Sequence, residues 1–104
     1  MAKIVWTEPA LDDLRQIIDF IAQDSPIYAE RIGIQLVEAP RRLEPFPLCG
    51  RIVPEFIDKS IRELICGSYR VIYQCRHDAC CIVAIVHASR NILLHVNPDE
   101  WSAR

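Results

Sequence analysis

Apolar residues recur at helical spacing in the first half of the chain. Between residues 9 and 24 they form one stripe on an otherwise polar segment, made by Leu11, Leu14, Ile17, Ile18 and Ile21. This stripe predicts an amphipathic helix over about residues 9–24. Thr7 is a suitable N-cap, and Pro9 falls in the first turn, where its missing N–H costs little.

A second helix is predicted to follow almost at once. Pro26 suits a first helical position, and either Asp24 or Ser25 can cap the helix. Its apolar face continues through Ala29, Ile32, Leu36 and Leu43. Pro40 interrupts this pattern, so the helix should end or kink near Glu38. Two helices joined by so short a turn are expected to pack as an antiparallel hairpin.

The second half of the chain changes to a strand pattern. Residues 61–66, 69–76 and 80–88 are rich in β-branched and aromatic residues, and short turns at 67–68 and 77–79 separate them. Such connections predict an antiparallel meander. A first strand at residues 3–6 would add at an edge or pair across the sheet. The expected fold is α+β, in the order β-α-α-β-β-β, with the hairpin on one face of an antiparallel sheet.

Length and composition limit the class of protein. The 104 residues suffice for one domain, residues 1–104, and 51% of them are hydrophobic. The start lacks the apolar run of a secretory signal, and no stretch approaches the length of a membrane span, so a soluble cytoplasmic protein is expected. The net charge of −2 is too weak to predict general nucleic-acid binding. Residues 91–104 indicate a loosely packed tail, although Trp101 suggests that it docks.

The five cysteines do not predict a disulfide framework, because their number is odd. The segment from Cys75 to Cys81 includes His77 and so concentrates zinc-ligand types. Its spacing matches no common structural zinc pattern, and it is equally typical of two strands and a turn. We therefore expect buried thiols, with no metal and no cofactor.

Five segments resemble a known superfamily in their order and spacing. They are ALDDL at 10–14, PLCGRIVPE at 47–55, IREL at 61–64, GSYRVIY at 67–73 and IVHASR at 85–90. Together they are similar to the RelE/ParE superfamily of toxins, on the ParE-like side, over roughly residues 3–92. The resemblance implies a growth-inhibiting toxin that a cognate antitoxin holds inactive by wrapping a C-terminal segment around it.

Two mechanisms occur among such toxins. RelE-like members cut messenger RNA on the ribosome, and ParE-like members inhibit DNA gyrase without established hydrolytic chemistry. If the chain is a nuclease, the resemblance points to Arg70, His87 and Arg90 as catalytic groups, with His95 near the place of an expected tyrosine. If it acts by binding, the expected target contacts are Arg51, Arg62, Tyr69, Arg70 and Arg90.

Cutting RNA needs a base, an acid and cations that offset charge in the transition state. The basic residues that RelE carries before its Tyr-Arg pair are replaced here by Ile61 and Glu63. The prediction is therefore a ParE-like toxin that binds gyrase. The alternatives are a ribosome-dependent nuclease and a toxin-derived protein that serves only as a binding partner or co-repressor.

Structural roles compete with these functional ones. Arg70 would pair with Glu63 if the two lie on neighbouring strands, and His87 would be hydrogen-bonded within the fold. The sheet register decides whether Tyr69 or Arg70 faces His87. If Arg70 contacts the target, Arg70→Ala should lower toxicity without unfolding the domain.

Overall fold

The computed structural model describes residues 1–95. Its elements are β1 (Lys3–Trp6), α1 (Glu8–Ala22), α2 (Pro26–Glu38), a 3₁₀ helix (Ala39–Leu43), β2 (Arg51–Ile52), β3 (Ile61–Cys66), β4 (Tyr69–Arg76), β5 (Ala79–His87) and α3 (Ile92–His95). The predicted α+β order is confirmed. In addition, a two-residue strand, β2, precedes the meander, and a single-turn helix, α3, lies in what we expected to be a tail.

Local sequence explains how the helical hairpin begins and ends. The Thr7 hydroxyl accepts from the backbone N–H of Ala10, and Ser25, not Asp24, caps α2 by accepting from Tyr28. Side-chain oxygens at these positions satisfy N–H groups that have no partner within the helix. The α-helical geometry of α2 ends at Glu38, as Pro40 predicted, and continues as a turn of 3₁₀ helix.

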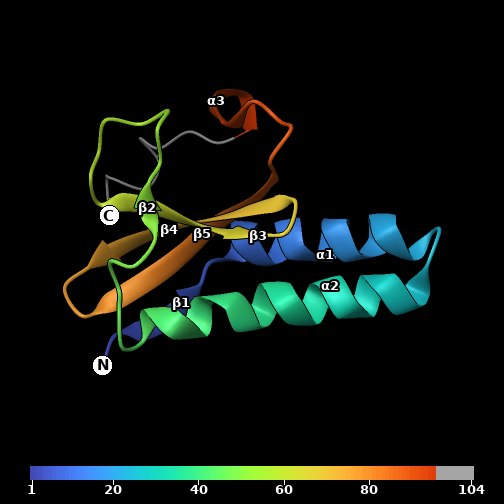
Figure 1. The fold of residues 1–104 in the computed structure, drawn as a ribbon, viewed down its shortest axis with the longest axis horizontal. Coiled ribbons are helices and arrows are strands. Elements are labelled where there is room, and N and C mark those ends of the chain that lie inside the picture. The colour runs from blue at the N-terminus through green and yellow to red at the C-terminus, as the bar shows by residue number, and fades with distance from the viewer. Residues whose placement is uncertain (96–104) are drawn as a thin grey trace.

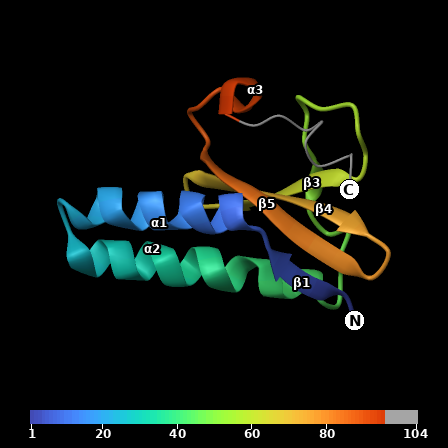
Figure 2. The same cartoon turned by 180° about the vertical axis from the view of Figure 1, so that it is seen from behind.

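The sheet has five strands in the order β1-β5-β4-β3-β2. The meander β3-β4-β5 is antiparallel, as expected. The first strand lies at an edge of the sheet, one of the two placements expected for it, but it pairs in parallel with β5, from Lys3 opposite Ala79 to Trp6 opposite Ile82, so the sheet is not antiparallel throughout. Figure 2 shows β1 beside β5 at the edge of the sheet. The parallel pairing is available because α1, α2 and the meander separate the two strands in sequence.

Both faces of the sheet are covered. The helices α1 and α2 lie side by side against one face and extend beyond its edge, and α3 lies on the other side (Figure 1). The core on the helix face is centred on Ala10, Leu36, Leu64, Val71, Tyr73, Ile82 and Ile85. The core on the opposite face contains Val53, Phe56, Ile61, Ile72, Val83, Val86 and Ile92. The segment between β2 and β3, together with α3, therefore closes the second face.

One β-bulge interrupts β5. The register with β4 shifts after Ile72, and Val83 is the extra residue. Because side chains alternate along a strand, one extra residue reverses which of the following side chains face the helices. Ile82 and Ile85 consequently both pack on the helix face. The bulge therefore places His87, two residues beyond Ile85, on the helix face as well.

Two expectations, the docking of Trp101 and the absence of a membrane span, depend on which residues the structure describes. Trp101 lies outside the described residues, so its docking stays a prediction. Within residues 1–95, no helix combines the length and the apolar character needed to cross a bilayer.

Candidate functional site

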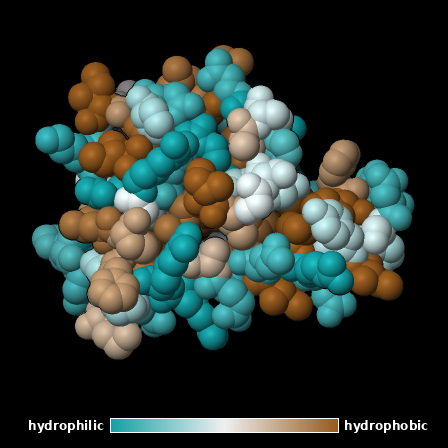
Figure 3. Space-filling view, viewed as in Figure 1, coloured by the Kyte–Doolittle hydropathy of each residue, from teal (hydrophilic) through white to brown (hydrophobic). Residues whose placement is uncertain are grey.

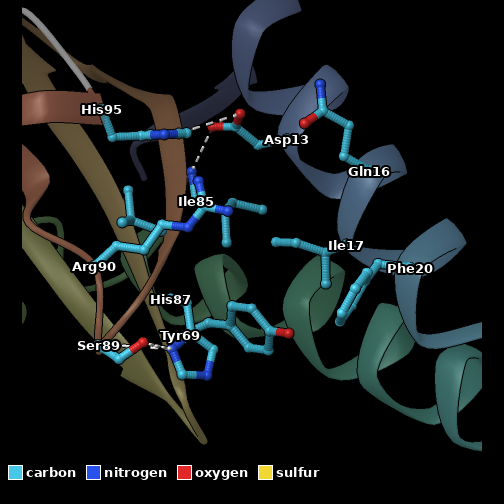
Figure 4. A pocket seen from close by; sticks show the side chains of 11 residues that line it. Asp13, Gln16, Ile17, Phe20, Tyr69, Ile85, His87, Ser89, Arg90 and His95 are labelled. Carbon is cyan, nitrogen blue, oxygen red and sulfur yellow. Dashed lines mark hydrogen bonds and ion pairs between the residues drawn. The ribbon is translucent and has the colours of Figure 1, made fainter.

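A pocket of about 430 Å³ lies between α1, the end of β5 and α3. It is lined by Asp13, Gln16, Ile17, Phe20, Tyr69, Ile85, Val86, His87, Ser89, Arg90 and His95. Figure 4 shows α1 on one side of this pocket and the strand end with Arg90, His87 and Tyr69 on the other. Four of the residues singled out from the sequence, Tyr69, His87, Arg90 and His95, therefore meet in one place.

His87 is exposed at the pocket and is held in a defined orientation. Its ring meets that of Tyr69, its register partner on β4, edge to face at a centroid distance of 5.3 Å. The backbone N–H of Ser89 donates to Nδ1 at 3.1 Å, and the Ser89 hydroxyl lies 2.7 Å from the same atom. Since Nδ1 accepts, the neutral ring carries its proton on Nε2. His87 thus offers an Nε2–H donor.

Asp13 joins α1 to both β5 and α3 at the upper end of the pocket. Its Oδ2 accepts from the backbone N–H of Ile85 at 3.0 Å, and its Oδ1 lies 3.5 Å from His95 Nε2. Burial raises the pKa of this carboxyl, although the Ile85 hydrogen bond and His95 both act to lower it. The sequence does not indicate this role of Asp13, because its partner Ile85 lies more than seventy positions away.

Asp13 should therefore make stability depend on pH. The pKa of Asp13 is higher in the folded state than in the unfolded state, where it is 3.8, so the neutral carboxyl stabilises the fold. This contribution is complete below pH 3.8 and is lost as the pH rises through the raised folded-state pKa. We expect wild type to lose stability relative to Asp13→Asn over this interval, since the amide oxygen keeps an acceptor for Ile85. Urea unfolding of both proteins at a series of pH values measures this, and a constant difference would contradict it.

A second cluster lies across the sheet from the helices. The Nε of Arg70 donates to Glu63 Oε1 at 2.5 Å, and its two terminal nitrogens donate to both oxygens of Glu55 at 2.9 and 2.7 Å. Arg51 donates from Nε to the other oxygen of Glu63. The side chain of Arg70 is 6% exposed and that of Glu63 is fully buried. The hydrogen bond from Arg70 lowers the pKa of Glu55, and the same interaction raises the pKa of Arg70.

Arg62 on β3 bonds to the loop that precedes β2. One terminal nitrogen of its guanidinium donates to the backbone carbonyls of Leu48 and Gly50 at 3.2 and 3.0 Å. Beside it, the backbone N–H of Gly50 donates to the buried hydroxyl of Tyr73 at 2.9 Å. Burial raises the pKa of Tyr73 to about 12, so this phenol stays neutral. Arg62 and Tyr73 thus hold the chain just before β2.

The residues named from the sequence therefore divide into two groups. Tyr69, His87, Arg90 and His95 line the pocket, whereas Arg51 and Arg70 lie in the ion cluster on the opposite face. Arg62 belongs to neither group, because it is opposite Tyr73 in the sheet and bonds to the loop before β2. The sequence also raised the pairing of Arg70 with Glu63, which the structure contains. It missed Glu55 as the second partner, because Glu55 reaches Arg70 only through the fold of the segment before β3.

The thiols of the expected strand–turn–strand segment lie close together. Cys75 and Cys80 are opposite each other on β4 and β5, with their sulfurs 2.6 Å apart, and both are free thiols. Burial raises the pKa of Cys80 to about 12, which keeps it protonated. In the part of the chain that the structure describes, no three metal-ligating side chains gather into a site.

A strand and a helical hairpin followed by a meander sheet define the fold of the small RelE/ParE-type toxins. The chromosomal ParDE toxin–antitoxin system from P. aeruginosa contains a chain of this fold, with a TM-score of 0.72, 21% identity, and coverage of 86% of this chain and 98% of that one. The toxin–antitoxin complex RelBE2 from Mycobacterium tuberculosis contains another, with a TM-score of 0.54, 18% identity, and coverage of 83% and 96%.

Sequence comparison then gives the family. The family model for the ParE toxin of the type II toxin–antitoxin system parDE matches residues 4–92. Toxin RelE2 of Caulobacter vibrioides is 37% identical over 91 residues, which cover 86% of this chain and 99% of that protein. The chain belongs to the ParE toxin family of type II toxin–antitoxin systems, within the RelE/ParE superfamily.

Proposed function

We propose that this toxin acts in the cytoplasm by binding and inhibiting DNA gyrase. The observation that supports this most is the separation of the candidate nuclease groups. His87 and Arg90 line the pocket on the helix face, whereas Arg70 lies on the opposite face with its guanidinium held by Glu55 and Glu63. A base, an acid and a phosphate-binding cation must reach one phosphate together. This arrangement keeps Arg70 apart from His87 and Arg90, so the three candidate groups do not meet at one phosphate.

Inhibition by binding requires accessible groups, and the expected target contacts differ in this respect. Arg90 is exposed, Tyr69 lines the pocket, and the Arg51 side chain is 58% exposed. We therefore propose these three as target contacts. For Arg62 and Arg70, whose guanidinium groups bond to the chain itself, we propose roles in folding.

We also propose that a cognate antitoxin covers the apolar surface of the toxin. Ile27, Ile34 and Val37 are exposed on α2, and hydrophobic side chains reach the surface along the helical hairpin (Figure 3). In addition, β2 pairs with only two residues of β3, so within residues 1–95 no strand pairs with the outer edge of β3 from Leu64 onward, and this edge can accept another strand. An amphipathic helix and an added strand fit such surfaces. The solved ParDE and RelBE2 relatives are toxin–antitoxin systems.

A gyrase supercoiling assay beside an in vitro translation assay tests the target. We expect supercoiling to be inhibited in proportion to the amount of toxin relative to gyrase, while translation continues. In cells, expression without antitoxin should cause filamentation and an SOS response. The measurements are gel mobility of the plasmid, peptide yield and cell length.

The nuclease alternative predicts the reverse pattern, and the name of the RelE2 relative makes it the alternative to test. Rapid message cleavage with translation arrest at substoichiometric amounts of toxin would overturn the gyrase proposal. Harmless overexpression of the folded chain would favour a protein that serves only as a binding partner.

A further inference from the structure

The pocket contains a cation, Arg90, whose guanidinium has no partner among the described residues. Only the backbone of Arg90 is bonded, through its N–H to the carbonyl of His87, while its guanidinium makes no hydrogen bond or ion pair within residues 1–95. Figure 4 shows this side chain extending from the end of β5 toward α1. Arginine presents a planar set of donors that matches a carboxylate. The Nε2–H of His87 adds a further donor.

Part of the pocket wall is apolar. Ile17 and Phe20 come from α1, and Ile85 comes from β5. Phe20 is 70% exposed, so an occupant would cover an aromatic ring that now faces solvent. Leu93 and Leu94 are also exposed on α3, the short helix that carries His95. The apolar surface therefore continues beyond the pocket, which favours an extended occupant over a small molecule.

The single carboxylate of the pocket is already occupied. Asp13 accepts from Ile85 and faces His95, so it does not neutralise Arg90. A second negative group is therefore favoured at the end formed by Arg90 and His87.

We propose that this pocket receives a segment of a partner protein that presents an acidic side chain next to an apolar one. The carboxylate binds Arg90 and His87, and the apolar neighbour packs on Phe20 and Ile17. This deepens the proposed function, since it assumes only that the toxin acts through protein partners, and it specifies the chemistry of the contacting segment.

Peptide binding by the full ¹⁵N-labelled chain tests the proposal. The probe is acetyl-Ala-Phe-Glu-Leu-amide, and its control is the same peptide with Gln in place of Glu. We expect the amide signals of Phe20, Ile85 and Ser89 to shift with the acidic peptide. The Gln peptide should bind about tenfold more weakly or worse, because a hydrogen bond to a charged group is lost.

Arg90→Gln and Phe20→Ala should each weaken binding of the acidic peptide. Arg15→Gln, on an exposed arginine of α1, should not.

Three results would overturn the proposal: equal binding of the two peptides, unchanged affinity in Arg90→Gln, or no shifts at millimolar peptide. The chain also carries Asp99, Glu100 and Trp101, which lie outside the described residues. If Asp99→Asn/Glu100→Gln in the full chain raises peptide affinity, this segment competes for the pocket, which would assign the site to the chain itself. No gyrase is present in these titrations, so their failure is distinct from failure of the gyrase proposal.

Discussion

Replacing Arg70 with alanine is expected to lower the free energy of unfolding by about 3–5 kcal/mol. Arg70 supplies three of the hydrogen bonds in the ion cluster, one to Glu63 and two to Glu55. Its removal leaves the fully buried Glu63 with only the half-exposed Arg51 as a partner. Breaking a buried pair from one side is costly because the remaining charge stays without compensation. Chemical denaturation of both proteins gives the difference.

Two further variants show whether the cause is the buried charge. Arg15→Ala removes an arginine whose pair with Asp12 is exposed, and should change stability by no more than about 0.5 kcal/mol. Adding Glu63→Gln to Arg70→Met should recover part of the loss, since no buried carboxylate then lacks its partner. If Arg70→Ala unfolds at the same denaturant concentration as wild type, the cluster does not stabilise the fold.

This result would change how a loss of toxicity is understood. The sequence alone predicted that Arg70→Ala would weaken toxicity in a folded domain. In the structure the guanidinium is buried and bonded to two carboxylates. A loss of toxicity in Arg70→Ala therefore indicates a lost target contact only if the variant is shown to be folded. Arg90, whose guanidinium has no partner within residues 1–95, is the better position at which to test a contact.

Gly50→Ala should cost about 2–3 kcal/mol, at the upper end of what overpacking usually costs. A Cβ atom there would lie 2.6 Å from the carbonyl oxygen of Glu63 and 2.6 Å from the hydroxyl of Tyr73. Neither neighbour moves freely, because one is strand backbone and the other belongs to a fully buried side chain. Relief requires the loop to shift, which weakens the Gly50 N–H hydrogen bond to Tyr73 and the Arg62 contact to the Gly50 carbonyl. Thermal and urea unfolding measure the effect.

Gly67 provides a matched control, because its backbone angle favours glycine there and the space around it does not. It lies in the turn between β3 and β4 with a φ of 58°, and a Cβ there would meet nothing within 4 Å. Asparagine tolerates this left-handed backbone, so Gly67→Asn should be nearly neutral. Gly50→Asn should remain as damaging as Gly50→Ala, because the obstacle is space and not backbone angle. Similar small effects at both positions would contradict the predicted clash.

The sequence determined the elements and their order. Spacing of apolar residues located both helices, Ser25 with Pro26 and then Pro40 marked the ends of the second helix, and the strand pattern gave the meander. These features are local, because a cap, a turn or an amphipathic stripe depends on residues within a few positions. The resemblance also led to the family, which the comparisons establish.

Tertiary structure alone decided which side chains meet. The extra residue Val83 sets the face on which His87 lies, and no sequence pattern marks it, because a bulge fits a continuous apolar strand as well as a regular ladder does. The partners of Arg70 come from two different segments, Glu63 on β3 and Glu55 before it, and Asp13 bonds to Ile85, 72 positions away in the sequence. Contacts of this kind depend on register and on loop closure, to which residues distant in sequence contribute together. The sequence could therefore name the arginines, and only the fold shows that Arg70 is buried in an ion cluster while Arg90 is exposed at the pocket.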